Sequence, residues 1–177
     1  ISGSHASVTQ NLSWSVAIEQ WIRELIISNT PVLGICYGHQ LLAKALGGRV
    51  EFHAKGIEIG TARIEMVKDE GSDPLFKGLP KMFNAHVCHS QTVTRLPDNA
   101  VRIAKNFFEP NHAFRIGQCA WGVQFHPEFD ERIMAAYAKN METAIKDSGL
   151  VLSEILDNIE PTPLPLKILG RFGTFVK

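Results

Sequence analysis

One short stretch limits what this chain can fold into more than any other: P-V-L-G-I-C-Y-G-H-Q-L-L, from Pro31 to Leu42. The apolar run 32–35 predicts a strand buried on both faces, and a helical pattern follows the Gly-x-Cys-x-Gly turn directly. A strand, a nucleophile between two glycines and a helix form the turn called a nucleophile elbow. Side chains in place of Gly34 and Gly38 would collide with the strand and the helix. We therefore expect Cys36 to project above the edge of a sheet.

Two properties of this turn favour a reactive cysteine. The N-terminus of the helix predicted over 38–46 carries a positive partial charge, which stabilises a thiolate and lowers the thiol pKa. The backbone N–H of Tyr37 points the same way, so it can hold an oxyanion. A buried structural cysteine is the commonest fate of a free thiol. That alternative does not explain why glycines stand on both sides of Cys36 at a junction between a strand and a helix.

A cysteine nucleophile needs a base, and the base needs a group that orients it. Among the seven histidines, His126 follows the strand-like segment G-V-Q-F and precedes Pro127 and Glu128. Residues two apart in an extended segment point to the same side, so the Glu128 carboxylate can reach the imidazole. If the two strands are parallel neighbours, their carboxyl ends lie together at the edge where open α/β sheets bind ligands. Taken singly, His126 and Glu128 are each explained by a purely structural role. Together with Cys36 they predict a catalytic triad.

The composition excludes several classes of protein. Eighteen basic residues balance eighteen acidic residues, which gives no electrostatic reason to bind nucleic acid or an anionic membrane. No apolar run approaches the roughly eighteen residues that span a bilayer. An odd, small number of cysteines (Cys36, Cys88 and Cys119) argues against a disulfide framework and fits the reducing cytosol. We therefore expect a cytoplasmic enzyme.

The rest of the pattern alternates between helices and strands. Helices are expected over 14–28, 38–46, 130–145 and 150–159, and a last short helix follows the proline-spaced segment 161–165, which we interpret as a surface linker. Strands are expected over 32–35, 83–93, 101–106 and 118–125, with further short strands between 50 and 67. This order predicts an α/β fold with an open, mostly parallel sheet flanked by helices and with inserted antiparallel strands.

The first helix has a clear apolar side. Ser13 is predicted to cap it. Its inward face is predicted to carry the apolar residues that recur at helical spacing, which are Trp14, Ala17, Ile18, Trp21, Leu25 and Ile26.

The two motifs G-I-C-Y-G-H-Q and, about ninety residues later, G-V-Q-F-H-P-E resemble those of the class I glutamine amidotransferase family, with the glutaminase domain of GMP synthase as the nearest type. The resemblance runs from Ile1 to about Ile145 and implies a flavodoxin-like sheet. It implies that Cys36 is the nucleophile, His126 the general base and acid, and Glu128 the residue that orients the imidazole. The reaction it implies is hydrolysis of the side-chain amide of L-glutamine through a γ-glutamyl thioester, without a cofactor.

Further stretches resemble the family's oxyanion loop and substrate segment. The opening I-S-G-S-H-A-S-V is similar to the family's S-G-G-P loop, with Gly3 kept, Ser4 in place of the second glycine and His5 in place of proline. The resemblance implies that the N–H groups of Ser4 and Tyr37 hold the oxyanion. The segment C-H-S-Q-T-V resembles the family's H-S-x-x-V, whose backbone holds the α-amino and α-carboxylate groups of glutamine. The residues that the resemblance places against substrate are Gln40, His89, Ser90 and Gln91.

Several alternatives remain at this stage. The spacing His86-x-x-His89 could indicate a metal site, but no second pair of ligands accompanies it, and we predict no metal. Members of the family usually hand ammonia to a synthetase; only about thirty residues follow the helix 130–145 here, and no G-x-x-x-x-G-K-[ST] motif occurs. The chain could therefore serve a separate synthetase subunit, hydrolyse γ-glutamyl peptides on its own, or be a non-catalytic homologue that binds a ligand or a partner.

We treat residues 1–177 as a single glutamine amidotransferase domain in which 146–177 form a helical tail. The family begins with strands that precede the oxyanion loop, whereas this sequence begins at Ile1. At roughly 30 residues per βαβ unit, one or two units are expected upstream of Ile1. Without them a central strand would keep an exposed edge.

Overall fold

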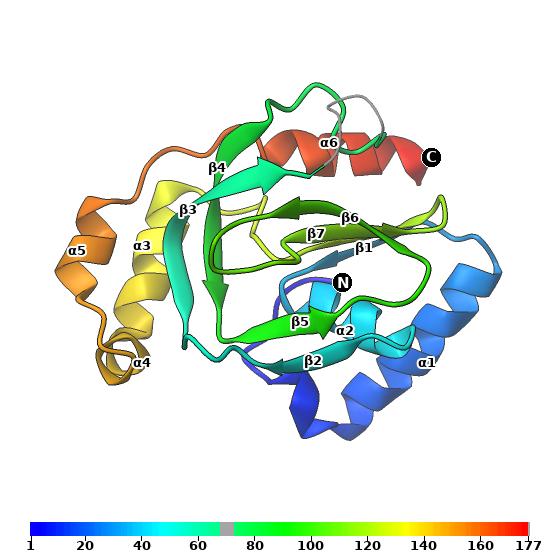
Figure 1. The fold of residues 1–177 in the computed structure, drawn as a ribbon, viewed down its shortest axis with the longest axis horizontal. Helices are drawn as coiled ribbons and strands as arrows, with labels where there is room; N and C mark the ends of the chain where they lie inside the picture. Colours follow the sequence, from blue (N-terminus) through cyan, green and yellow to red (C-terminus); the bar gives the residue numbers. More distant parts are fainter. Residues whose placement is uncertain (68–72, 177) are drawn as a thin grey trace.

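The computed structural model describes residues 1–67 and 73–176. Within these residues, the centre is a curled, mixed sheet of six strands in the order β1-β8-β7-β6-β3-β4, with helices on both faces (Figure 1). Its strands are β1 (Val32–Ile35), β8 (Ala120–Val123), β7 (Ala113–Ile116), β6 (Ala100–Lys105), β3 (Glu58–Met66) and β4 (Met82–His89). A two-stranded antiparallel sheet pairs β2 (Arg49–Phe52) with β5 (Gln91–Arg95).

The helices of the described residues cover the sheet in two layers and at one end. They are η1 (Val8–Gln10), α1 (Ser13–Ile27), α2 (Tyr37–Ala45), α3 (Glu131–Asn140), α4 (Glu142–Asp147), α5 (Leu152–Asp157) and α6 (Leu166–Phe175). In Figure 1, α1 and α2 lie on one side of the main sheet and α6 on the other, while α3, α4 and α5 gather beside β3. Among the helices that the structure describes, none is long and apolar enough to cross a membrane.

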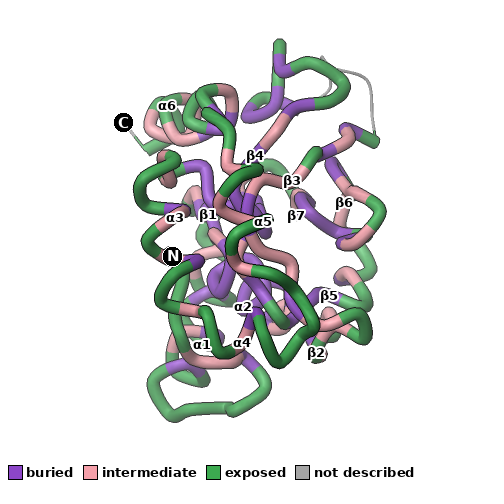
Figure 2. Tube along the Cα trace, turned by 90° about the vertical axis from the view of Figure 1, so that its left-hand side faces the viewer, coloured by how far each residue is buried: buried purple, intermediate pink, exposed green. Residues whose placement is uncertain are grey.

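The short strand β1 is buried on both faces, as its unbroken apolar run predicts. Val32 belongs to the core under α1 and α2, whereas Leu33 belongs to the core on the other face, which α6 covers. The neighbouring strand β8 also contributes side chains to both cores, with Ala120 on the first face and Trp121 on the second. Buried positions accordingly concentrate along the central strands (Figure 2).

The predicted α/β class is confirmed. The strand over 32–35 is found at its predicted bounds, and the elbow helix begins one residue earlier than predicted. Within the described sheet, β1 and β8 are parallel while the other paired strands are antiparallel, so the parallel part is smaller than predicted. The helix predicted over 130–145 is divided at Met141 into α3 and α4. Ile1 hydrogen-bonds to the backbone of β1 at Leu33 and Ile35.

The predicted start of α1 is wrong, and its predicted inward face is right only in part, since Ile18, Leu25 and Ile26 do pack against the core. Leu12, not Ser13, occupies the N-cap position, and no side chain caps the helix. Trp14 and Trp21, predicted to lie in the core, are 43% and 53% exposed. The helix is rotated so that its buried residues are Ser15, Glu19 and Ile22.

Polar partners on α2 explain this rotation. The Tyr37 hydroxyl donates a hydrogen bond to Ser15 Oγ at 2.6 Å, and Lys44 Nζ lies 2.6 Å from the Glu19 carboxylate. Buried polar groups must find such partners, so the α1–α2 contact selects the side of α1 that supplies them. Hydrophobic spacing alone does not carry that information.

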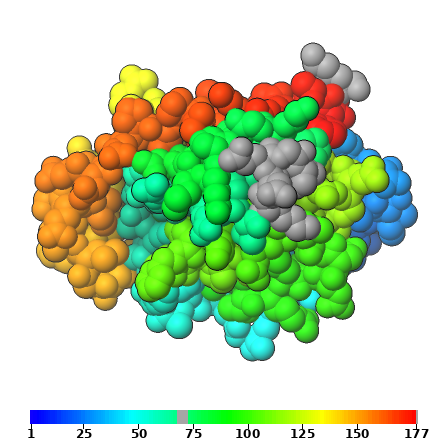
Figure 3. All heavy atoms as spheres, turned by 45° about the horizontal axis from the view of Figure 1, so that its top comes forward, coloured from blue at the N-terminus to red at the C-terminus, as the bar shows by residue number. Residues whose placement is uncertain are grey.

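The C-terminal helix α6 packs as part of the core. Ile168 is fully buried, and the rings of Phe172 and Phe175 lie 6.4 and 5.1 Å from Trp121. Arg171 donates a hydrogen bond to the carbonyl oxygen of Leu75. Figure 3 shows the chain from α5 to α6 as a continuous orange-to-red band across one face of the molecule.

We expect Ile168→Ala to lower the free energy of unfolding by about 2–4 kcal/mol, because it leaves a cavity between α6 and the sheet. Urea unfolding followed by circular dichroism measures this loss. Leu166→Ala on the same helix is the matched control, since Leu166 is 58% exposed; its effect should stay within about 0.5 kcal/mol. Equal effects of the two substitutions would contradict the docking of α6.

Candidate active site

The turn between β1 and α2 has the geometry of a nucleophile elbow. Cys36 adopts φ 50° and ψ −101°, a left-handed conformation that is costly for a residue with a side chain. A methyl group on Gly34 would overlap the carbonyl oxygen of Gly38, and one on Gly38 would overlap the carbonyl oxygen of Ile1. Both glycines are therefore required by close backbone contacts, as the sequence predicted.

The Cys36 thiol lies in a buried environment. Its sulfur donates to the carbonyl oxygen of Cys88 at 3.6 Å. Burial raises the pKa of this thiol to about 12, and Cys88 adds to the rise, although a hydrogen bond from the Tyr37 N–H opposes it. The lowered pKa predicted from the helix N-terminus is thus wrong for this state, because desolvation outweighs the favourable dipole. The resting sulfur is a neutral thiol, and a base must remove its proton.

The predicted base and the carboxylate predicted to orient it lie at the end of the adjacent strand. The parallel register pairs Ile35 with Val123, and the Cys36 N–H donates to the Val123 carbonyl at 2.8 Å. Three residues on, His126 Nδ1 lies 2.8 Å from Glu128 Oε1. Because a carboxylate accepts, Nδ1 carries the proton and Nε2 keeps its lone pair. This is the arrangement that a general base requires.

Gly3 brings the opening loop against both reactive groups. A Cβ atom placed on Gly3 would lie 3.2 Å from Cε1 of His126 and 3.9 Å from Cβ of Cys36. The imidazole and the cysteine therefore meet the same point of the backbone. The next residue, Ser4, turns its hydroxyl onto the N–H of Ala6, which shapes the loop beside the cysteine.

A cavity of about 300 Å³ opens above these groups. All residues that the sequence assigned to the site line it, except His89. Its wall also includes residues to which the sequence assigned no role in the site, namely Ser2, His5, Ala6, Ser7, Cys88, Phe129, Tyr137 and Met141.

Two glutamines that were assigned to substrate binding use their side chains for hydrogen bonds within the protein. Gln40 Nε2 donates to the carbonyl oxygen of Gln91 at 2.9 Å and to Gln124 Oε1 at 3.0 Å. The Gln91 amide accepts from the N–H of Val8 and donates to Thr9. These bonds tie the elbow helix, the segment after β4 and the opening loop together. What remains for a ligand at Gln91 is backbone.

Gln124 was not identified as a site residue from the sequence. Besides accepting from Gln40, it lies beside the Cys36 sulfur, where its side chain acts to lower the thiol pKa. A fully buried polar residue directly before the F-H-P-E segment was the available signal. In the sequence, Gln124 has the features of an ordinary strand residue.

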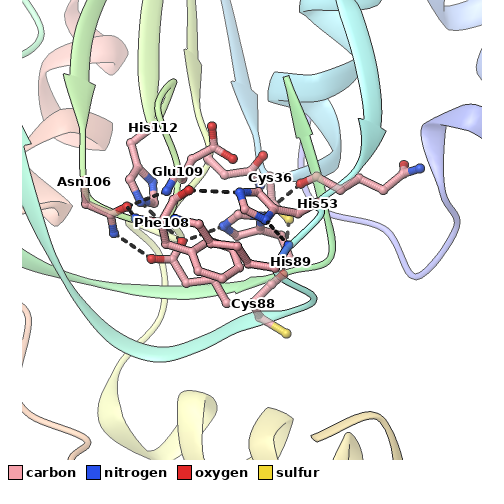
Figure 4. A network of polar contacts seen from close by, with 12 residues as sticks. Cys36, His53, Cys88, His89, Asn106, Phe108, Glu109 and His112 are labelled. Carbon is pink, nitrogen blue, oxygen red and sulfur yellow. Dashed lines mark hydrogen bonds and ion pairs between the residues drawn. The ribbon is translucent and has the colours of Figure 1, made fainter. Parts of the chain in front are cut away.

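His89 does not point into the cavity but into a buried polar network (Figure 4). Its Nδ1 donates to the carbonyl oxygen of Gln91 at 2.9 Å, and its Nε2 lies 2.8 Å from Glu58 Oε2. Both neighbours accept hydrogen bonds, so both ring nitrogens carry protons and the ring is an imidazolium. His89 therefore contributes to this site by holding the Gln91 backbone in place.

Glu58 on β3 is the anion of this network. Asn106 donates to its other oxygen at 2.6 Å, and His112 Nε2 stands 3.3 Å from Oε2. Burial would raise the pKa of the Glu58 carboxyl, but the hydrogen bonds from His112 and His89 outweigh it and hold that pKa well below its usual range. Burial would likewise lower the pKa of His89, but the bond to Glu58 and its charge raise it.

The network residues could not be identified from spacing in the sequence. Glu58 lies 31 residues before His89, and Asn106, Glu109 and His112 come from the segment after β6. Figure 4 shows Asn106, Glu109 and His112 in the network with His89. Within the described residues, no group of three or more His, Cys, Asp or Glu is arranged to hold a metal ion.

Residues 1–141 match the family described as glutamine amidotransferase class-I. The chain belongs to this family. The resemblance stated from the sequence motifs is thereby confirmed, and the match covers the elbow, the substrate segment and the H-P-E segment in one stretch.

Similar proteins fall into two groups. The GMP synthase [glutamine-hydrolyzing] of Thermosipho melanesiensis is 45% identical over 101 residues, which are 56% of this chain and 19% of that protein. Gamma-glutamyl peptidase 4 of Arabidopsis thaliana is 33% identical over 136 residues, 76% of this chain and 54% of that protein. The chain thus spans about a fifth and about half the length of these curated relatives. A glutamine amidotransferase of Thermotoga maritima has a similar structure, with a TM-score of 0.80 and 28% identity over 99% of this chain and 76% of that one.

We expect Glu58→Gln to lower the free energy of unfolding by about 3–5 kcal/mol near pH 5.5, because it leaves the His89 imidazolium buried without its anion. The depressed carboxyl pKa stabilises the fold above roughly pH 4.3, and that contribution is lost as the pH falls through the folded-state pKa. The raised imidazole pKa stabilises it below roughly pH 6.5, and that contribution is lost as the pH rises through the folded-state pKa. The difference from wild type should therefore shrink above neutral pH.

Urea unfolding at several pH values measures this difference. Glu65→Gln on the same strand is the control, because Glu65 faces Lys105 at 3.9 Å and both side chains are about 40% exposed. Such a surface pair contributes less than about 1 kcal/mol. Similar losses for Glu58→Gln and Glu65→Gln, or a loss that does not vary with pH, would refute the buried ion pair.

Proposed function

We propose that this chain is a cysteine amidohydrolase that releases ammonia from the side-chain amide of L-glutamine through a γ-glutamyl thioester. The observation that carries the proposal is the placement of Cys36 on a strained elbow, with the His126–Glu128 pair bonded at 2.8 Å beside the same glycine. Membership in the glutamine amidotransferase class-I family supports it.

The first half of the reaction makes the thioester. His126 Nε2 takes the proton of the Cys36 thiol as sulfur attacks the amide carbon, because burial makes a standing thiolate unfavourable. The oxyanion that forms is held by the N–H of Tyr37, which already faces the sulfur, and by the N–H of Ser4 across the cavity. His126 then gives its proton to the amide nitrogen, the C–N bond breaks, and ammonia leaves.

The second half returns the enzyme to its resting state. His126 removes a proton from water as the water oxygen attacks the thioester carbon. The C–S bond breaks, Cys36 regains the proton, and glutamate leaves. Glu128 stays ionised throughout and holds Nδ1, so that Nε2 alternates between base and acid.

The binding of the α-amino and α-carboxylate groups is assigned to the backbone of Ser90 and Gln91. Both residues line the cavity, and His89 and Gln40 hold the Gln91 carbonyl while the His53 N–H holds that of Ser90. No cofactor enters this scheme. The ammonia would pass to water or to a separate synthetase subunit. Three free thiols, one of them the nucleophile, favour a reducing cytoplasm as the place of action.

A second candidate is hydrolysis of γ-glutamyl peptides. The same residues act only on the γ-carbonyl group, so the chemistry is unchanged when an amine replaces ammonia as the leaving group. The likeness to gamma-glutamyl peptidase 4 supports this candidate. The cavity also extends beyond the groups that glutamine itself would need.

We expect Cys36→Ala to reduce turnover at least a thousandfold, because no other group in the proposed triad can form the thioester. Ammonia release from L-glutamine and amine release from γ-glutamyl-cysteinyl-glycine are measured side by side. Cys119→Ala, outside the cavity, is the matched control and should keep wild-type rates. Acid quenching followed by peptide mass spectrometry should find one glutamyl group on the peptide that contains Cys36.

A binding measurement distinguishes a variant that has lost only the reaction from one that has lost the binding site. Cys36→Ala should still bind L-glutamine or the peptide in calorimetry. Substantial turnover by Cys36→Ala would rule out the proposed thioester mechanism. A wild-type enzyme that binds neither compound nor forms the adduct would rule out the proposed reaction and favour a non-catalytic homologue.

A further inference from the structure

A row of aromatic rings continues the active-site cavity outward from the base. Phe129 stacks on His126 with ring centres 4.0 Å apart and planes 16° apart. Tyr137 on α3 lies 4.8 Å from Phe129, and His5 of the opening loop stacks on Tyr137 at 6.1 Å and 10°. We call His5, Phe129 and Tyr137 the aromatic wall. All three line the same cavity as Cys36.

Phe129 and Tyr137 pack against the core around Met134 and Ile145, but glutamine hydrolysis gives the cavity side of the wall no task. The substrate's α groups are assigned to the Ser90–Gln91 backbone and its carbonyl oxygen to the N–H groups of Ser4 and Tyr37. Ammonia is too small to need an apolar wall. Yet Phe129 and Tyr137 remain half-buried and His5 exposed, so part of each ring stays accessible from the cavity although the rings contact one another.

The position of His126 decides which part of a substrate would meet the wall. The general acid must stand beside the leaving nitrogen, because it protonates that atom as the C–N bond breaks. Phe129 lies directly on the His126 ring, and Tyr137 and His5 continue from it. A substituent on the leaving nitrogen therefore enters the space along the wall.

The residues that line the cavity indicate which type of chemical group this substituent would be. Aromatic rings favour a flat, apolar group that can stack. Met141, whose sulfur lies 3.2 Å from that of Cys88, adds a polarisable surface on the same side. No lysine or arginine is among the described residues that line the cavity, so it offers no side-chain partner of this kind for a carboxylate on the leaving amine.

We propose that the aromatic wall is a leaving-group subsite, and that the preferred substrates are γ-glutamyl amides of amines that carry an aromatic ring. This proposal rests on the proposed amidohydrolase function and specifies its substrate class. It also gives a role to the departure from S-G-G-P in the opening loop: His5 supplies a planar ring where proline would not.

The test compares two amides that differ by one ring, L-γ-glutamyl-phenethylamide and L-γ-glutamyl-ethylamide. The ratio of their kcat/KM values cancels effects on the thioester chemistry common to both. Wild type should favour the phenethylamide about tenfold or more. Tyr137→Ala and His5→Ala should each lower that ratio about three- to tenfold, the contribution of one aromatic pair. Tyr137→Phe, which keeps the ring, should preserve it.

Phe107→Ala is the control, since its ring is 95% exposed and outside the cavity. The same two amides are titrated into Cys36→Ala by calorimetry, which tests the subsite without turnover. Tighter binding of the phenethylamide, weakened by adding Tyr137→Ala or His5→Ala, supports the proposal.

The outcomes separate the two proposals. Cys36-dependent hydrolysis of both amides with no ring preference, or with a preference that Tyr137→Ala and His5→Ala leave unchanged, overturns the subsite and leaves the amidohydrolase intact. Absence of hydrolysis overturns the amidohydrolase. Equal affinity of Cys36→Ala for both amides then overturns the subsite as well.

Discussion

The parallel pairing of β1 with β8 is the constraint on which the site depends. It places the Cys36 N–H on the Val123 carbonyl, so the end of one strand and the end of the other share an edge. From that edge the elbow lifts the thiol, and the segment after β8 carries His126 and Glu128. The two cores on either face of the sheet hold β1 and β8 from both sides. A shift of one residue in this register would exchange the faces to which their side chains point.

Burial determines which groups of the site are charged, and it also makes an unpaired charge there destabilising. The same desolvation that keeps the Cys36 thiol neutral makes the Glu58–His89 ion pair dependent on complete pairing. The pair holds the Gln91 carbonyl, which Gln40 also contacts, so a charge on β3 positions the backbone beside the nucleophile. Preorganisation of this kind lets backbone groups act on a substrate without rearrangement at the moment of reaction.

The geometry of the elbow and of the His126–Glu128 pair could be predicted from the sequence because each is local. Gly34 and Gly38 lie within four residues, and His126 and Glu128 within two, so sterics and strand geometry connect them directly. Where distant segments meet, prediction was weaker. The inward face of α1 was set by Tyr37 and Lys44, and the orientation of His89 by Glu58. Hydrophobic periodicity in the sequence identifies none of these three partners.

The sequence alone determined the elbow, the pairing of His126 with Glu128 and the α/β class, since each follows from short-range backbone geometry and hydrophobic pattern. Only the tertiary structure decided the protonation of the thiol, because that depends on how much water the packed chain excludes from the sulfur. It likewise decided that His5, Phe129 and Tyr137 form one wall, because their rings come from three separate segments. Long-range packing supplies this information, and no local rule in the sequence contains it.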